Sequence, residues 1–372
     1  MKLTIERAAL LRSLAHVQSV VERRNTIPIL SNVLLEASEE GLGLTATDMD
    51  LAIHEKTVAG VQETGATTVP AHTFYDIVRK LPDGSEIELA LQGETGQIQL
   101  RAGRSNFVLP TLPREDFPAA AVSELPCRFT LQAEEAKNLI DRTRFAISTE
   151  ETRYYLNGIH MHAGTSDNAG VLRAVATDGH RLARVEMALP QGAVEMPGII
   201  VPRKTVNELR KLIDELDGAV EVALSETRIC FTFGQIMLSS KLIDGTFPDY
   251  ERVIPSGNDK IMSVDCRSFA AAVDRVSTIS TEKSRAVKLS LNGETLTLSA
   301  TSPEAGSADE KLAVDYEGPP LEIGFNSRYL LDIALQIEGE GAEFAMIDAS
   351  SPTIVRDLAD SSALYVLMPM RV

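Results

Sequence analysis

The 372-residue chain has no tryptophan and three widely separated cysteines, Cys127, Cys230 and Cys266. That spacing excludes a CxxC metal site and is typical of free thiols in a reducing compartment, so we expect a cytoplasmic protein. No stretch approaches the roughly 18 consecutive apolar residues that a membrane-spanning helix needs. Residues 1–7 also lack the apolar core of a signal peptide.

Motifs of the common enzyme classes are missing as well. The chain has no GxGxxG after a predicted strand, no P-loop, no HExxH and no GxSxG, and we expect no cofactor. One enzymatic alternative stays open, because His160 and His162 lie two apart on a predicted strand. Together with Asp178 and His180 they could hold a metal ion in a hydrolase. A half-exposed sheet face is the commoner interpretation of the two histidines.

Positive charge is scarce overall, since 53 acidic residues outnumber 36 basic ones and the net charge is −17. Taken as an average, this balance argues against a nucleic-acid partner, because phosphates prefer basic surfaces. An average charge can conceal a local basic surface, so the distribution of charged residues along the chain decides whether nucleic acid can be a partner.

What the chain does have is a threefold internal repeat. The strand that ends in Ala46-Thr47-Asp48 recurs before Ala176-Thr177-Asp178 and Ala300-Thr301-Ser302, at spacings of 130 and 124 residues. Periods of this length correspond to whole domains. We therefore predict three tandem α+β domains over 1–124, 125–256 and 257–372, each with two helices packed on antiparallel sheet. Pro-, Gly- and acid-rich connectors run over 112–125 and 245–258.

The first helix of each copy is where basic residues gather. Leu10, Leu14, Val17 and Val21 recur at spacings of 4, 3 and 4, which is one apolar helix face. The three segments 1–24, 137–153 and 267–285 together hold 13 bases and 7 acids. Arg142, Arg275 and the matching His16 lie about 200° from that face and are predicted to point away from the core. Domains curving together would then have a basic concave side, while scattered solvated charge, which is normal for any helix surface, is the alternative interpretation.

Two stretches depart from their counterparts in the other copies. Residues 178–182 read Asp-Gly-His-Arg-Leu, which suggests either a local site on a structural unit or simple divergence. Arg153-Tyr154-Tyr155 follows the first helix of copy two. Its tyrosines could stack on nucleic acid, or they could pack within the sheet.

Several segments of the sequence resemble the bacterial DNA polymerase III β subunit family, the sliding clamps, and the resemblance extends over the whole chain. The matching segments are Arg24 through Leu30, Arg153-Tyr154-Tyr155-Leu156-Asn157-Gly158, Val175 through Ala183, Phe247-Pro248-Asp249-Tyr250 and Met368-Pro369-Met370-Arg371. The final residue is Val372 where leucine is common in the family.

The resemblance implies a non-catalytic replicative clamp in which two chains join head to tail. Six domains would form a ring, with twelve helices lining the hole. Such a ring would encircle double-stranded DNA through phosphate contacts and without sequence readout. Replicative and repair polymerases, the clamp loader complex and other proteins with a clamp-binding peptide would be its partners. A three-domain scaffold that binds proteins without encircling DNA is the remaining alternative, although it would not need basic first helices.

The resemblance also assigns residues to three sites. Its DNA contacts would be Arg24, Arg79, Arg153, Tyr154 and Tyr155, while the acidic Glu150 puts a further contact in doubt. Its dimer interface would include Phe107, Thr278 and Ile279. Its pocket for partner peptides would be formed by Leu156, Thr177, Gly179, His180, Arg181, Leu182, Pro248, Val253, Val366, Met368, Pro369, Met370 and Arg371. Methionines and a glycine suit a groove that accepts varied peptides.

Overall fold

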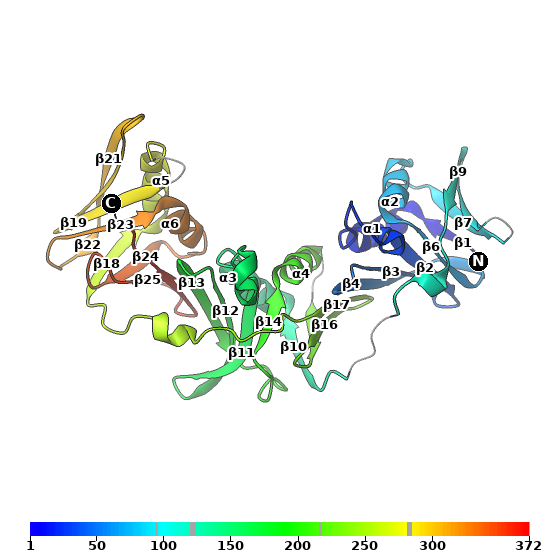
Figure 1. The fold of residues 1–372 in the computed structure, drawn as a ribbon, viewed down its shortest axis with the longest axis horizontal. Coiled ribbons are helices and arrows are strands. Elements are labelled where there is room, and N and C mark those ends of the chain that lie inside the picture. Colours follow the sequence, from blue (N-terminus) through cyan, green and yellow to red (C-terminus); the bar gives the residue numbers. More distant parts are fainter. Residues whose placement is uncertain (94–95, 120–123, 216–217, 281–284, 372) are drawn as a thin grey trace. The chain divides into compact units, whose positions relative to one another are not determined.

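The computed structural model describes residues 1–93, 96–119, 124–215, 218–280 and 285–371 (Figure 1). These residues form two compact units. Unit 1 comprises residues 1–133, 191–196 and 207–242, and unit 2 comprises residues 134–190, 197–206 and 243–372. The middle copy of the repeat is therefore shared between the two units. The domain limits expected from the sequence stay a prediction.

Each copy begins with a strand and a helix and contains a second helix further on. In copy one the elements are β1 (Lys2–Glu6), α1 (Arg7–Gln18), η1 (Pro28–Ser31), β2 (Asn32–Ser38), β3 (Gly41–Thr47), β4 (Leu51–Thr57), β5 (Gly60–Glu63), β6 (Gly65–Pro70), α2 (Ala71–Lys80), β7 (Glu86–Gln92), β8 (Gln97–Ala102) and β9 (Ser105–Pro110). The turn η2 (Arg114–Asp116) lies in the first connector, whose residues 120–123 fall outside the described residues.

Copies two and three repeat this order. Copy two contains β10 (Cys127–Gln132), α3 (Ala133–Arg144), η3 (Glu151–Leu156), β11 (Gly158–Ser166), β12 (Ala169–Thr177), β13 (Arg181–Ala188), β14 (Ile199–Pro202), α4 (Arg203–Glu215), β15 (Ala219–Leu224), β16 (Arg228–Phe233) and β17 (Ile236–Lys241). After η4 (Tyr250–Val253), copy three contains β18 (Lys260–Asp265), α5 (Cys266–Ser277), β19 (Ala286–Asn292), β20 (Thr295–Ser302), β21 (Gly306–Ala313), β22 (Asp315–Tyr316), β23 (Leu321–Asn326), α6 (Ser327–Ala334), β24 (Gly341–Met346), β25 (Thr353–Asp357) and β26 (Ala363–Leu367). The predicted α+β class with two helices per copy is confirmed.

Strand pairing continues from one copy into the next. In unit 1, β17 of copy two pairs antiparallel with β4 of copy one, and we call this the first junction. In unit 2, β13 of copy two pairs antiparallel with β26 of copy three, which is the second junction. Within the described residues, the sheet β5-β1-β7-β8-β9 has β5 and β9 as its edge strands, and the sheet β21-β20-β19-β23 has β21 and β23.

The predicted apolar face of the first helix is confirmed, because Leu10, Leu14, Val17 and Val21 are all buried. Phe269, Val273 and Val276 of α5 are buried in the same way. Such burial against sheet is what stabilises short helices, since propensity alone is marginal in water.

The predicted exposure of the polar residues opposite that face is wrong for two of the three copies. His16 and Arg142 are each 5% exposed, whereas Arg275 is exposed and pairs with Glu310. His16 lies between Glu55 of copy one and Glu215 of copy two, and Arg142 reaches Asp360 of copy three. These side chains do leave their own core, but the neighbouring copy covers them.

Candidate functional site

A cavity of about 320 Å³ lies in unit 2, beside the second junction, and we call it the unit 2 cavity. Strand ends, the turn η3, the connector before copy three and the last residues of the chain meet there. Its walls are formed by Arg153, Tyr155, Leu156, Thr177, Gly179, Arg181, Leu182, Pro248, Asp249, Tyr250, Val253, Val366 and Met368. Below these walls is an apolar cluster to which Leu156, Leu182, Tyr250 and Val366 belong.

Most of the predicted peptide-pocket residues meet in this cavity. Leu156, Thr177, Gly179, Arg181, Leu182, Pro248, Val253, Val366 and Met368 all line it. The four others, His180, Pro369, Met370 and Arg371, do not belong to its lining. The Met368 amide donates to the His180 carbonyl at 2.9 Å, and the Met370 amide donates to Gly324 at 2.8 Å. The chain end is thereby held beside the cavity, and Val372 lies outside the described residues.

The loop 178–181 is shaped by its own side chains. Asp178 Oδ1 accepts from the amides of His180 (2.9 Å) and Arg181 (3.0 Å), which closes a tight turn after β12. Gly179 has φ +88°, and a Cβ there would meet Nη1 of Arg153 at 2.5 Å. Glycine is therefore favoured by the backbone conformation, and any larger residue would also displace the end of the Arg153 side chain.

Arg181 contributes to the wall while its charged group is occupied elsewhere. The guanidinium donates to Asp178 (3.1 Å), Asp332 (2.5 Å) and the Phe145 carbonyl (2.6 Å), and it lies 4.4 Å from the Tyr329 ring centroid. A ligand would therefore meet the flank of Arg181, because the polar end is engaged in holding α6 and the end of α3.

Sequence reasoning missed two wall residues and assigned two others to a different role. Asp249 and Tyr250 are in the connector, where composition predicts only a linker. Arg153 and Tyr155 were expected at DNA, yet both line the unit 2 cavity. Tyr154 is 53% exposed and stands edge-on to Tyr155.

The remaining predicted DNA residues are on the surface. Arg24 is exposed after α1. Arg79 is exposed in the last turn of α2, where it pairs with Asp76 at 3.0 Å. Glu150 is exposed and bonds Arg153, and this bond to the Arg153 guanidinium lowers the pKa of Glu150. The carboxylate therefore stays ionised and offsets the Arg153 charge.

The histidines of the metal alternative have other partners. His162 Nδ1 lies 2.8 Å from the Ala163 carbonyl and Nε2 lies 2.9 Å from the Tyr250 hydroxyl. His160 stacks on Phe247, and Asp178 is occupied by its own loop. Within the described residues, no group of three His, Cys, Asp or Glu side chains is arranged to hold a metal ion.

The predicted interface residues lie on the edge strand β9 or at the end of α5. Phe107 is half-buried in β9, Thr278 is the exposed residue that caps α5, and Ile279 follows it, half-buried.

The three cysteines are free thiols. Cys127 is partly exposed, whereas Cys230 and Cys266 are buried. In the described part of the chain, no helix is long and apolar enough to cross a membrane.

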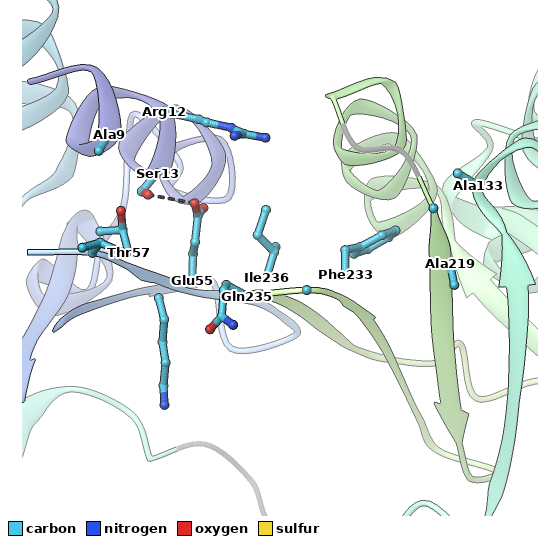
Figure 2. Close-up of a pocket in the computed structure, with 14 residues that line it drawn as sticks. Ala9, Arg12, Ser13, Glu55, Thr57, Ala133, Ala219, Phe233, Gln235 and Ile236 are labelled. Carbon is cyan, nitrogen blue, oxygen red and sulfur yellow. Dashed lines mark hydrogen bonds between the residues drawn. The ribbon is translucent and has the colours of Figure 1, made fainter. Parts of the chain in front are cut away.

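A second cavity, of about 390 Å³, lies beside the first junction in unit 1 (Figure 2). Arg12 and Ser13 project from α1 on one side of it, and Phe233 stands on the other. Its buried carboxylate, Glu55, accepts from the Ser13 hydroxyl at 2.7 Å and also contacts His16. None of the residues predicted to be functional lines this cavity.

Comparison with known proteins agrees with this architecture. The chain matches the N-terminal domain of the DNA polymerase III beta subunit over residues 1–121, the central domain over 130–249 and the C-terminal domain over 251–371. It is 54% identical to the beta sliding clamp of Caulobacter vibrioides (strain NA1000 / CB15N) over 372 residues, with 100% of both chains covered. Against the beta sliding clamp of Escherichia coli (strain K12) the identity is 41% over 373 residues, with 100% of both covered.

Solved structures give the same result. A beta sliding clamp from Caulobacter crescentus superimposes with a TM-score of 0.98 at 54% identity, covering 100% of this chain and 99% of that one. A sliding clamp from Bartonella birtlesii bound to griselimycin superimposes with a TM-score of 0.97 at 51% identity, covering 100% of both. The fold is thus that of three tandem clamp domains. The chain belongs to the DNA polymerase III beta subunit family, the non-catalytic sliding clamps of DNA replication.

Proposed function

We propose that two copies of this chain join head to tail into a closed six-domain ring around duplex DNA, and that the unit 2 cavity tethers DNA polymerases and other partners to it. The observation that carries this proposal is the pair of sheet junctions within the chain. Both join the strand that follows the Ala-Thr strand of one copy to the last strand of the next copy. The same join can be made once more between β21 of copy three and β9 of a second protomer.

The register of that third junction follows from the first. Ile53 pairs with Leu238 at the first junction. Ala308 is the counterpart of Ile53, because both are paired with the alanine of the repeated Ala-Thr strand. Phe107 is the counterpart of Leu238 when the tight β8–β9 and β16–β17 turns are superimposed. We therefore expect Phe107 of one protomer opposite Ala308 of the other.

Charge supports the same pairing. Arg104 is exposed in the turn before β9 and Arg101 is exposed on the neighbouring strand β8, while β21 carries the acidic Asp309 and Glu310 beside one base, Lys311. Opposite charges on facing edges favour the head-to-tail pair over two identical edges meeting. Thr278 takes the place of Ser19, which donates to Glu208 across the first junction at 2.6 Å. Thr278 is therefore expected to reach the second protomer.

DNA binding in this proposal is weak and without sequence preference. Arg24, Arg79, Arg153, Tyr154 and Tyr155 are the proposed contacts, and together with other exposed bases on the helices they would attract phosphates. Such contacts are sensitive to salt and carry no base readout. Retention on DNA would come from closure of the ring, so that the contacts can remain weak enough for sliding.

The unit 2 cavity is the proposed tether. Its apolar floor and the exposed Met368 suit the apolar side chains of a short linear peptide. The clamp loader complex, replicative and repair polymerases, and other proteins with such a peptide are the proposed partners. Griselimycin, which is bound to the Bartonella relative, is proposed as a further ligand. Free thiols and the replicative role favour the cytoplasm.

Retention on circular DNA tests the ring. Labelled protein is loaded with its clamp loader and ATP onto a nicked circular plasmid and gel-filtered before and after the plasmid is linearised. Co-elution with the circle and loss after cutting is the expected result, because a closed ring slides off a free end. Retention on both forms would indicate ordinary affinity, and retention on neither would favour a protein-binding scaffold.

Cross-linking tests the register separately. A chain that carries Phe107→Cys and Ala308→Cys should form a covalent dimer under mild oxidation, whereas either single substitution should not. Failure of the double variant to cross-link would contradict the β9–β21 pairing even if the ring stays on the plasmid.

A further inference from the structure

One wall of the unit 2 cavity is built from the connector between copies two and three. Pro248, Asp249, Tyr250 and Val253 line it, the last two from the single turn η4. A connector has little sheet pairing to hold it, so its position depends on side-chain contacts.

Two consecutive residues of η4, Tyr250 and Glu251, each form a hydrogen bond with one member of a cross-strand pair in the sheet. The Tyr250 hydroxyl lies 2.9 Å from His162 Nε2. Arg173 Nη1 donates to Glu251 Oε1 at 2.6 Å. His162 on β11 and Arg173 on β12 are directly opposite each other in the strand register. The pair therefore forms a two-point anchor beneath the turn.

The proton positions at this anchor follow from the partners. His162 Nδ1 faces the Ala163 carbonyl, which only accepts, so Nδ1 is the nitrogen that donates. Nε2 is then the acceptor, and the Tyr250 hydroxyl donates to it. Burial raises the pKa of Tyr250, against the effect of the nearby Arg173 charge, so the phenol keeps its proton.

The anchor is itself held rigidly. His162 stacks on His160 with ring centroids 4.9 Å apart, and His160 stacks on Phe247 at 4.7 Å. Burial and the neighbouring His162 lower the pKa of His160 to about 4, so His160 adds no charge to the stack at neutral pH. Arg173 is 8% exposed and also donates to Glu186 at 2.8 Å and to the Thr165 carbonyl at 3.0 Å.

We infer that His162 and Arg173 are positioning residues for partner binding, a role that rests on the proposed function of the unit 2 cavity. They hold η4 so that the Tyr250 ring and Val253 already form the wall when an apolar peptide arrives. Neither side chain lines the cavity, so neither would touch the peptide itself. Preorganising a wall in this way raises affinity because less order has to be created on binding.

Calorimetry with a synthetic peptide that copies the C-terminal tail of the replicative polymerase tests this inference. In His162→Phe the ring still stacks on His160 but has no nitrogen for Tyr250, and we expect roughly 5- to 10-fold weaker binding, the worth of one buried hydrogen bond. His162→Gln keeps an amide acceptor and should bind within about 2-fold of the unchanged chain. Glu251→Gln, on the exposed side of the second anchor, should weaken binding by about 2-fold.

A double-mutant cycle separates positioning from general destabilisation. Tyr250→Phe keeps the ring in the wall and removes the hydroxyl, so it should weaken binding at least as much as His162→Phe does, because the hydroxyl also bonds Arg173. The double variant should be no weaker than Tyr250→Phe alone. Equal binding by His162→Phe and the unchanged chain, or fully additive losses in the double variant, would overturn the inference. An unchanged chain that binds no peptide would instead overturn the proposed pocket and the inference with it.

Discussion

The first and second junctions have the same strand pairing but different chemistry at the same helix position. At the first, His16 bridges Glu55 (2.6 Å) and Glu215 (2.8 Å). At the second, Arg142 bonds Asp360 and Ser362 and faces the Tyr365 hydroxyl at 3.4 Å. The guanidinium is charged at every relevant pH, whereas an imidazole is charged only when protonated. One fold thus repeats a junction whose electrostatics differ between copies.

The unit 2 cavity lies beside the second junction, and the largest effect that we predict is the loss of peptide binding at this cavity. Deleting Met368 to Val372 removes a wall residue and the strand-end contact to His180, so binding of the polymerase tail peptide should be lost. The dimer should stay intact, because β9 and β21 are untouched, whereas retention on a plasmid should be lost because the clamp loader is proposed to use the same cavity. Calorimetry and sedimentation measure the first two outcomes, and undiminished peptide affinity would contradict the pocket.

Removing the permanent charge should weaken the second junction strongly. Arg142→Met leaves the Tyr365 hydroxyl and part of Asp360 without a partner, at a cost of about 2–4 kcal/mol in the free energy of unfolding. Urea denaturation measures it. The matched control is Arg114→Met, since Arg114 is half-exposed beside Glu36 and should leave the midpoint unchanged. A midpoint as high as that of the control would mean that Arg142 is dispensable.

The first junction should respond to pH where the second does not. Burial alone would lower the pKa of His16, but its bonds to Glu55 and Glu215 and their charges raise it above 6.5. A raised folded-state pKa stabilises the fold fully below the unfolded value and less as pH rises through the folded value. We expect a contribution of about 1–2 kcal/mol at pH 6 that declines in alkaline buffer.

Denaturation of the unchanged chain and of His16→Gln at a series of pH values checks this. The difference between the two should shrink as the pH rises above 6.5, while the deficit of Arg142→Met should stay constant over the same range. A His16 difference that grows toward alkaline pH would refute the assignment of a protonated bridge.

The smallest expected effect concerns neither junction. Replacing Arg24 and Arg79 by alanine should reduce the slope of log affinity for DNA against log salt by about two, one phosphate each, and slow loading. The dimer should stay intact in sedimentation, because neither residue is on β9 or β21. A salt slope equal to that of the unchanged chain would remove these two residues from the DNA contacts.

The repeat and the buried helix faces could be predicted because both appear in the sequence as regular spacings of similar residues. The buried face of α1 and the two helices of each copy follow from spacing alone. The surroundings of His16 and Arg142 could not, because a helix pattern reports which side faces its own core and says nothing of a neighbour that covers the other side. Their burial depends on strand pairing between residues about 180 positions apart, as in Met237 and His54.

The candidate site likewise depends on contacts between distant parts of the chain, which local sequence patterns do not report. Leu156, Leu182 and Met368 were assigned through resemblance, and the fold brings them to one cavity. Tyr250 was missed because its importance lies in a hydroxyl that reaches His162, a contact between a connector and a strand 88 residues earlier. Arg153 and Tyr155 line the cavity as well, since η3 turns both toward Gly179 and the connector, and their contact with DNA stays a prediction.

The edge strands β9 and β21 have a consequence for assembly. In the proposed ring they pair with each other and not with themselves, so each protomer would accept another at both ends. Head-to-tail contacts of this kind give a ring when the rotation per protomer closes and an open fibre when it does not. The rotation at each junction would therefore decide between a finite assembly of two chains and endless polymerisation, and substitutions that change this rotation should produce filaments.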